Sequence, residues 1–109
     1  MKRIFYASGS FLTSDAIADA LLSYADALAH SYASDVVDFP IVLPNGSIGT
    51  ASTLIGPASQ VASATEVSEL PEPDDEGLVE ELERRIKAIG TPRPVVQPAN
   101  EIDIKSDYE

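Results

Sequence analysis

The sequence changes character near residue 66, and this change limits which part of the chain can build a core. Residues 1–65 contain two basic and five acidic side chains, which leaves that part with a charge of −3. Residues 66–109 contain five basic and thirteen acidic side chains, a charge of −8, together with frequent prolines. A segment of low hydrophobicity and high net charge cannot bury enough apolar surface to fold alone. The core is therefore expected in the first part.

We predict a single domain over residues 1–90 and a flexible tail over residues 91–109. A domain of about 90 residues is near the size at which a single hydrophobic core gives only moderate stability. Contact with a second copy of the chain would bury additional apolar surface. The tail has Pro92, Pro94 and Pro98, and then alternating charges around Ile102 and Ile104. Disorder in isolation is expected for it, with addition of the two isoleucines to a sheet edge as the alternative.

Composition excludes several classes of function. The chain has no cysteine, which removes disulfides, thiolate nucleophiles and cysteine-ligated metal sites. Its net charge of −11 repels phosphate backbones, so no nucleic-acid partner is expected. The apolar run Ile4–Ala7 is too short for a signal peptide, and no stretch approaches the ~20 apolar residues of a membrane span. We expect a cytoplasmic protein without a membrane partner, and its alanine-rich, lysine-poor composition is typical of bacterial chains.

Residues 1–30 predict a strand, a connection and a helix. Lys2–Ala7 is rich in the side chains that favour a short strand, and Ser8–Leu12 is interpreted as a connection. Thr13 is the expected N-cap residue of a helix over residues 14–30. The helix should bury a stripe with spacings of three and four, formed by Ile17, Ala20, Leu21, Tyr24 and Leu28.

Residues 35–55 predict a β-hairpin. Hydrophobicity alternates with a period of two over Asp35–Leu43, and Asn45-Gly46 favours a two-residue type I′ turn. That turn would place four cross-strand pairs under the helix: Leu43–Ile48, Ile41–Thr50, Phe39–Ser52 and Val37–Leu54. The opposite face would be half apolar, which suits an interface, and its apolar members would be Val36, Val42, Ala51 and Ile55.

A weak strand and a well-defined helix are expected after the hairpin. Gln60–Val67 alternates weakly, and an acidic, proline-containing linker over residues 68–75 follows it. A second helix over Asp75–Ile89 has an apolar stripe of Leu78, Val79, Leu82, Ile86 and Ile89. Acidic side chains in this helix lie four residues before basic ones, a spacing that stabilises it. The helix is expected either to fold back on its own domain or to dock on another chain.

Together these elements predict an α+β domain with the order β-α-β-β-(β)-α. The sheet would be mixed and three- to four-stranded, with a helix on one face. A right-handed crossover through the first helix would make the strand Lys2–Ala7 parallel to Asp35–Leu43.

Few residues are candidates for chemistry. His30 is the single histidine, and its place in the last turn of the first helix, one turn after Asp26, favours a capping role over catalysis. The acidic cluster over residues 72–76 does not have the spacing of a calcium loop, and helix-start charges explain it. We therefore predict no catalytic residue, no metal and no cofactor.

The loop before the first helix is a candidate ligand site. Ser8, Gly9, Ser10 and Thr13 would lie between a strand and a helix N-terminus, where α/β folds often receive an anion. The loop has no second or third glycine and no nearby basic residue, so the interpretation as a simple connection is favoured.

Three functional hypotheses follow. The first is a small acidic, non-enzymatic protein that acts by protein–protein contact and self-associates. Its interface would be formed by Val36, Val42, Ala51, Ile55, Leu78, Leu82 and Ile86. The second is a domain, or a weak enzyme, that binds a small molecule or an anion at the loop Ser8–Ser10 and Thr13. The third is an inhibitor or immunity-type protein that covers a basic partner with its acidic helices.

Overall fold

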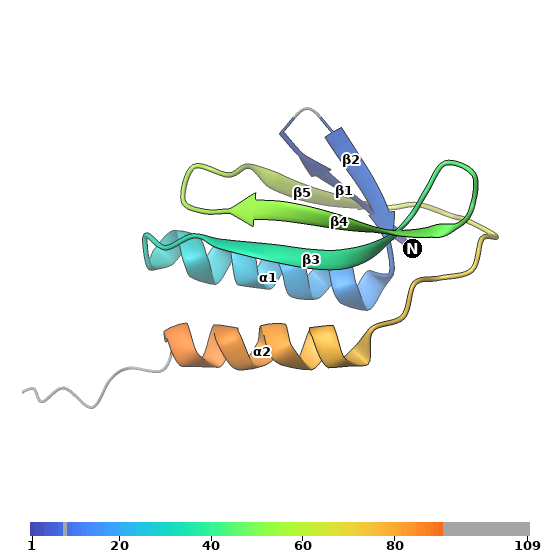
Figure 1. Ribbon diagram of the computed structural model, residues 1–109. Helices are drawn as coiled ribbons and strands as arrows, with labels where there is room; N and C mark the ends of the chain where they lie inside the picture. Colours follow the sequence, from blue (N-terminus) through green and yellow to red (C-terminus); the bar gives the residue numbers. More distant parts are fainter. Residues whose placement is uncertain (8, 91–109) are drawn as a thin grey trace, which may run out of the picture.

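The computed structural model describes residues 1–7 and 9–90, and it has an α+β fold as expected. One five-stranded sheet has the strand order β4-β3-β2-β1-β5, and every neighbouring pair is antiparallel. The elements are β1 (Lys2–Tyr6), β2 (Gly9–Thr13), α1 (Asp15–His30), β3 (Asp35–Val42), β4 (Ile48–Ile55), β5 (Val61–Thr65) and α2 (Glu76–Gly90) (Figure 1). The predicted tail, residues 91–109, lies outside the described residues.

The predicted connection before the first helix is wrong, because residues 9–13 form strand β2. β2 pairs with β1 along its whole length, from Lys2 opposite Thr13 to Tyr6 opposite Gly9. The cross-strand partner of Ile4 is Phe11, whose ring packs edge-on against Phe39 at a centroid distance of 5.9 Å. This aromatic contact in the core stabilises β2, and a reading of local turn residues could not detect it.

The helix begins one residue later than predicted. Ser14 is the N-cap residue of α1, and its Oγ accepts a hydrogen bond from the Ile17 amide at 3.2 Å. Thr13 is the last residue of β2, and its hydroxyl donates to the Pro40 carbonyl at 2.9 Å. Thr13 is therefore a link between β2 and β3 instead of a helix cap.

The strand β2 also changes the topology. Because β2 reverses the chain before α1 begins, β3 lies antiparallel to β2, and the predicted parallel pairing of the first strand with β3 does not occur. β2 and β3 pair only at Leu12 and Val42. The two hairpins diverge away from this pair (Figure 1).

The β3–β4 turn is longer by one residue than predicted. The Gly46 amide donates to the Leu43 carbonyl at 2.8 Å, and the Leu43 amide donates to the Ser47 carbonyl at 2.8 Å. Gly46 has a φ of +88°, so Pro44, Asn45 and Gly46 form a three-residue loop that ends in a G1-type bulge. Pro44 suits the first central position of such a turn.

This longer turn shifts the register by one residue, so the predicted pairing is wrong. Phe39 lies opposite Ala51 and not Ser52, and Val37 lies opposite Thr53 and not Leu54. A shift of one residue moves every side chain of a strand to the other face. Leu54 is therefore 58% exposed, whereas Ala51 and Ile55 are buried.

The strand weakly predicted over Gln60–Val67 is present as β5, with the shorter bounds Val61–Thr65. β5 pairs with β1 from Tyr6 opposite Val61 to Lys2 opposite Thr65. β4 and β5 are thus the two edges of the sheet.

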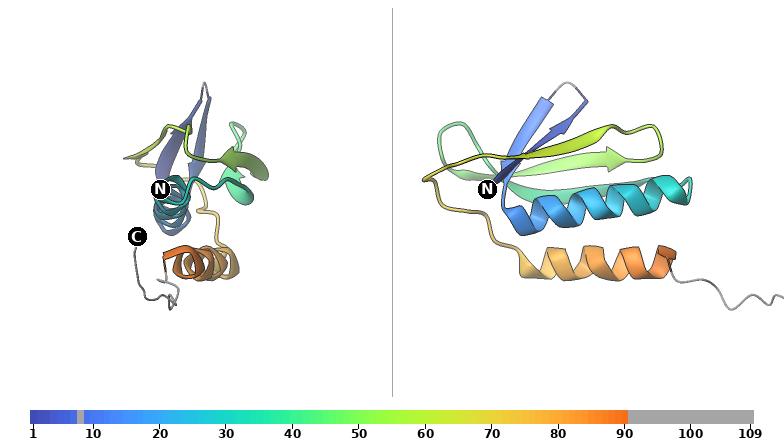
Figure 2. Two further views of the ribbon diagram at one scale, coloured as in Figure 1. Left: turned by 90° about the vertical axis from the view of Figure 1, so that its left-hand side faces the viewer. Right: turned by 180° about the vertical axis from the view of Figure 1, so that it is seen from behind.

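The core lies between the sheet and α1, and α2 packs on the far side of α1 (Figure 2). The sheet contributes the buried residues Ile4, Val37, Phe39, Ile41, Ala51 and Ile55. The predicted apolar stripe of α1 is buried in full. From α2, Leu82 is completely buried, while Leu78, Val79, Ile86 and Ile89 are partly buried against the core. The second helix thus folds back on its own domain.

Candidate functional site

The structure does not bring the four predicted ligand-site residues together. Gly9 and Thr13 are the two ends of β2 and therefore lie about 14 Å apart. Thr13 is buried and bonded to Pro40, and the exposed Ser10 hydroxyl accepts a hydrogen bond from the Arg3 guanidinium at 3.2 Å. Ser8 lies outside the described residues.

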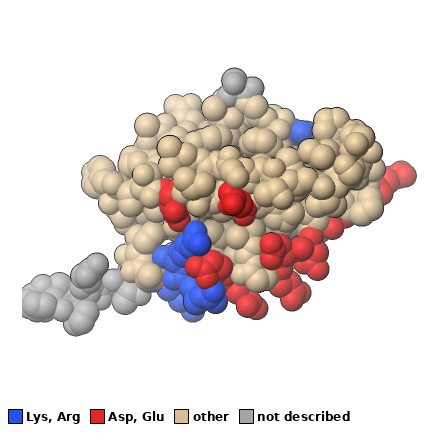
Figure 3. Space-filling model, in the orientation of Figure 1, with Lys and Arg blue, Asp and Glu red and all other residues tan. Residues whose placement is uncertain are grey.

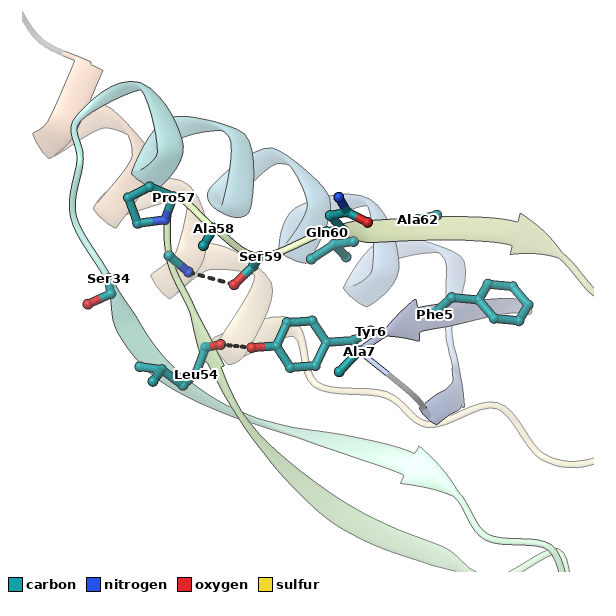
Figure 4. A pocket seen from close by; sticks show the side chains of 12 residues that line it. Phe5, Tyr6, Ala7, Ser34, Leu54, Pro57, Ala58, Ser59, Gln60 and Ala62 are labelled. Carbon is teal, nitrogen blue, oxygen red and sulfur yellow. Dashed lines mark hydrogen bonds between the residues drawn. The ribbon is translucent and has the colours of Figure 1, made fainter.

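A groove opens instead where the β4–β5 loop passes the end of β1 (Figure 4). It encloses about 720 Å³ and is lined by Phe5, Tyr6 and Ala7 of the first hairpin, by Ser34 and Leu54, and by residues 56–62. The Tyr6 hydroxyl donates to the Leu54 carbonyl across the groove, and the Ser59 hydroxyl accepts from the Gly56 amide at 3.0 Å. These polar groups are engaged within the protein, so the groove presents mainly apolar surface.

Two exposed apolar side chains line the groove and a third lies beside one of them, and we call Phe5, Val36 and Leu54 the sheet patch. Phe5 and Leu54 line the groove, and Val36 lies directly opposite Leu54 in the β3–β4 ladder. Their exposed fractions are 46%, 58% and 58%. The shifted register creates the patch, because it turns Leu54 away from the core. Sequence reasoning missed Leu54 for this reason.

The predicted interface residues are distributed over different parts of the fold. Val36 is exposed as expected, whereas Ala51, Ile55 and Leu82 belong to the core beside α1. The following residues are partly or fully covered within the chain: Val42, Leu78 and Ile86. Val42 lines a second hollow of about 470 Å³ together with Leu70 of the linker.

Charge is distributed unevenly over the surface. Acidic side chains gather over the helices, and the surface above the strands has few charged atoms (Figure 3). β2, β4 and β5 contain no charged residue. On β1, Lys2 pairs with Asp19 at 2.6 Å and Arg3 pairs with Glu66 at 2.6 Å. The Arg3 guanidinium, chiefly through its hydrogen bond, holds the pKa of Glu66 below its usual range.

One polar network joins α1, β3 and α2. The Tyr24 hydroxyl donates to Asp35 Oδ2 at 2.6 Å, and Arg85 Nη1 donates to the same oxygen at 2.9 Å. The hydrogen bond from Tyr24 is the main reason that the pKa of Asp35 lies below its usual range. Burial, followed by the hydrogen bond to Asp35, raises the pKa of Tyr24. The bond from Arg85 to Asp35 ties α2 to the body of the domain, and within α2 Arg85 also bonds Glu81 at 2.9 Å.

The remaining candidates have structural partners. His30 Nδ1 lies 2.9 Å from the Asp26 carbonyl oxygen and 3.3 Å from its carboxylate. Asp75 Oδ1 accepts from the Leu78 amide at 3.0 Å at the start of α2. Glu72 lies 3.8 Å from the N-terminal ammonium. Among the described residues, no cluster of His, Asp and Glu side chains is arranged to hold a metal ion.

Comparisons with protein-family models, with curated proteins and with solved structures return no match to this chain. Within residues 1–7 and 9–90, neither helix combines the length and the hydrophobicity that a membrane crossing requires. The surface features most distinct from the rest of the fold are therefore the groove, the sheet patch and the uncharged strand β4.

Proposed function

We propose that this protein acts by contact with another protein chain and that it self-associates through the sheet patch. The observation that carries the proposal is the exposure of Phe5 and Leu54, which line a mainly apolar groove, and of Val36, which lies opposite Leu54. Large apolar side chains that remain in water on one face of a sheet are typical of a surface that another molecule covers. Burying their exposed halves would contribute on the order of 1 kcal/mol per side chain.

The charges indicate where a second copy of the chain would make contact. Two copies that each carry a net charge of −11 repel one another, and the repulsion is strongest where acidic helices meet. Contact at the strands keeps the acidic surfaces of the helices apart. The small size of the folded part makes additional burial of apolar surface valuable.

Sedimentation equilibrium over a concentration series tests the proposal. The wild-type mass should rise from 11.6 kDa toward twice that value, and added salt should strengthen association because it screens repulsion. A monomer at every concentration and salt level would contradict self-association. Binding to a basic partner, as in the inhibitor hypothesis, should instead weaken with salt.

Matched substitutions locate the contact. Leu54→Ser and Val36→Ser should weaken association, since both remove apolar surface from the sheet patch. Val67→Ser is the control, because Val67 follows β5, is 94% exposed and lies outside the patch. Equal effects of Val36→Ser and Val67→Ser would place the contact elsewhere.

A second candidate function is the binding of a small apolar molecule in the groove. The observation that favours it is the volume of about 720 Å³, which lies in the range of ligand pockets. Titration with a panel of apolar metabolites, followed by the amide chemical shifts of Phe5, Tyr6 and Leu54, separates the two candidates. Changes in these chemical shifts in a protein that stays monomeric would favour ligand binding. Amide shifts that do not change with any compound of the panel would exclude it.

A further inference from the structure

The main-chain groups on one side of β4 point away from its neighbour β3. The hydrogen bond from the Leu43 amide to the Ser47 carbonyl identifies this pair as a hydrogen-bonded pair of the ladder. In an antiparallel ladder such pairs recur at every second residue, so Gly49, Ala51 and Thr53 bond to β3. The amides and carbonyls of Ile48, Thr50, Ser52 and Leu54 therefore face outward. The Leu54 carbonyl agrees with this assignment, because it accepts from Tyr6 of β1.

β4 has none of the features that usually protect a sheet edge. It is eight residues long, it contains no charged residue and no proline, and within the described part of the chain no strand pairs with its outer side. Natural sheets usually protect such edges with charges, prolines, bulges or short strands. A long unprotected edge is therefore a site at which another strand can add.

The other edge of the sheet is different. β5 has only five residues. A hollow of about 640 Å³ separates it from α1, and Asp19 and Asp26 of α1 line this hollow together with Val61 of β5. A second acidic chain would be repelled there. The charge distribution thus distinguishes β4 from β5 as a pairing edge for another copy.

We propose that β4 pairs antiparallel with β4 of a second copy about a two-fold axis, with Thr50 opposite Thr50 of the partner subunit. This inference rests on the proposed self-association and names its contact. The register also pairs Ile48 with Ser52 of the partner subunit, and the reverse. Each such pair exchanges two main-chain bonds, so the shared ladder contains about six.

The hydrogen bond of Tyr6 favours the ladder centred on Thr50 over the alternative ladder centred on Ala51. Centring the ladder on Ala51 would pair Ile48 with Leu54 of the partner subunit and would use the Leu54 carbonyl, which Tyr6 already engages. Centring it on Thr50 leaves the bond between Tyr6 and Leu54 intact. It also brings the loop Pro44–Gly46 of the second copy toward Leu54, where the groove and the sheet patch lie. The edge and the groove then form one continuous contact.

Proline substitution tests the edge without removing a bond of the monomer. Thr50→Pro removes an outward N–H that β3 does not use, and proline is tolerated at such edge positions. Ser63→Pro is the matched control on β5. The bond from the Glu66 amide to the Met1 carbonyl shows that Ala62 and Ala64 face β1, so the Ser63 amide also faces outward. We expect Thr50→Pro to raise the dissociation constant at least about tenfold and Ser63→Pro to leave it unchanged.

Disulfide crosslinking tests the register. The chain has no native cysteine, so an introduced cysteine can form a disulfide only with its copy in the second chain. Facing residues of a hydrogen-bonded pair have Cα atoms about 5.5 Å apart, which a disulfide can span. Thr50→Cys should give a disulfide-linked dimer on mild oxidation, and Ser63→Cys should stay monomeric.

The outcomes separate this inference from the proposed function. A wild-type protein that never associates contradicts both. Association that Leu54→Ser weakens, but that a folded Thr50→Pro variant retains, overturns the edge pairing and leaves the sheet patch as the contact. Circular dichroism of dilute samples establishes that the proline variants are folded. A dimer that crosslinks through Ser63→Cys instead assigns the pairing to β5 and overturns the inference.

Discussion

The hydroxyl of Tyr6 in β1 donates a hydrogen bond to the carbonyl of Leu54 in β4, 48 residues away in the sequence. The bond crosses the gap between two hairpins whose strands otherwise pair at Leu12 and Val42. It crosses the groove and uses an outward carbonyl of the β4 edge. This contact therefore links the shape of the groove to the length of edge that can receive another strand.

Removal of the Tyr6 hydroxyl should loosen the gap between the hairpins. Tyr6→Phe loses one hydrogen bond, so the free energy of unfolding should fall by about 1 kcal/mol in urea titrations. Tyr32→Phe is the control, because Tyr32 is 88% exposed. Equal stability of Tyr6→Phe and the wild-type protein would show that the bond contributes nothing in solution.

Leu82 should account for most of the docking of α2. The side chain is fully buried against the core, so Leu82→Ala should cost about 2–5 kcal/mol of unfolding free energy. Leu22→Ala makes the same substitution on α1 at a side chain that is 37% exposed, and its cost should be smaller. If both variants lost the same stability in denaturant titrations, α2 would not be packed as described.

Asp35 should make the domain sensitive to acid. Its pKa is lower in the folded state than the ordinary value of about 3.9, so its contribution to stability is present above that pH. The contribution is lost as the pH falls through the lower folded value. Asp35→Asn should therefore flatten the loss of thermal stability between about pH 5 and pH 3, without abolishing it, because the pKa values of Glu66 and Glu81 are also lowered.

The control for this pH profile is Asp38→Asn, which removes an exposed carboxylate from the same strand. The two aspartates differ in their partners, since Asp35 binds Tyr24 and Arg85. Identical pH profiles of the two variants would contradict the stabilising role of the network.

Gly46 should be intolerant of a side chain. Its φ of +88° is unfavourable for other residues, and an added Cβ would lie 3.3 Å from a methyl group of Leu70. Gly46→Ala should therefore destabilise the domain by about 1–2 kcal/mol in urea titrations. Gly9→Ala should be nearly neutral, because an added Cβ there meets nothing within 4 Å. A neutral Gly46→Ala would argue against the three-residue turn.

The sequence by itself determined the elements whose signals are local. The stripe of α1 follows the helical repeat, β3 alternates with a period of two, and α2 combines an apolar stripe with charge pairs four residues apart. Each signal arises from residues within a few positions of one another. These elements were therefore predicted with bounds close to those in the structure.

Tertiary structure decided the features that depend on distant partners. β2 pairs along its length with β1, and the contact of Phe11 with Phe39, which holds β2 against the core, is not contained in any local pattern. The turn around Asn45 and Gly46 was located correctly, but one additional loop residue inverted the faces of β4. The candidate site depends on that inversion, because the exposure of Leu54 creates the sheet patch. Side chains alternate along a strand, so local preferences can identify β4, and only its pairing and the packing against α1 decide which side faces water.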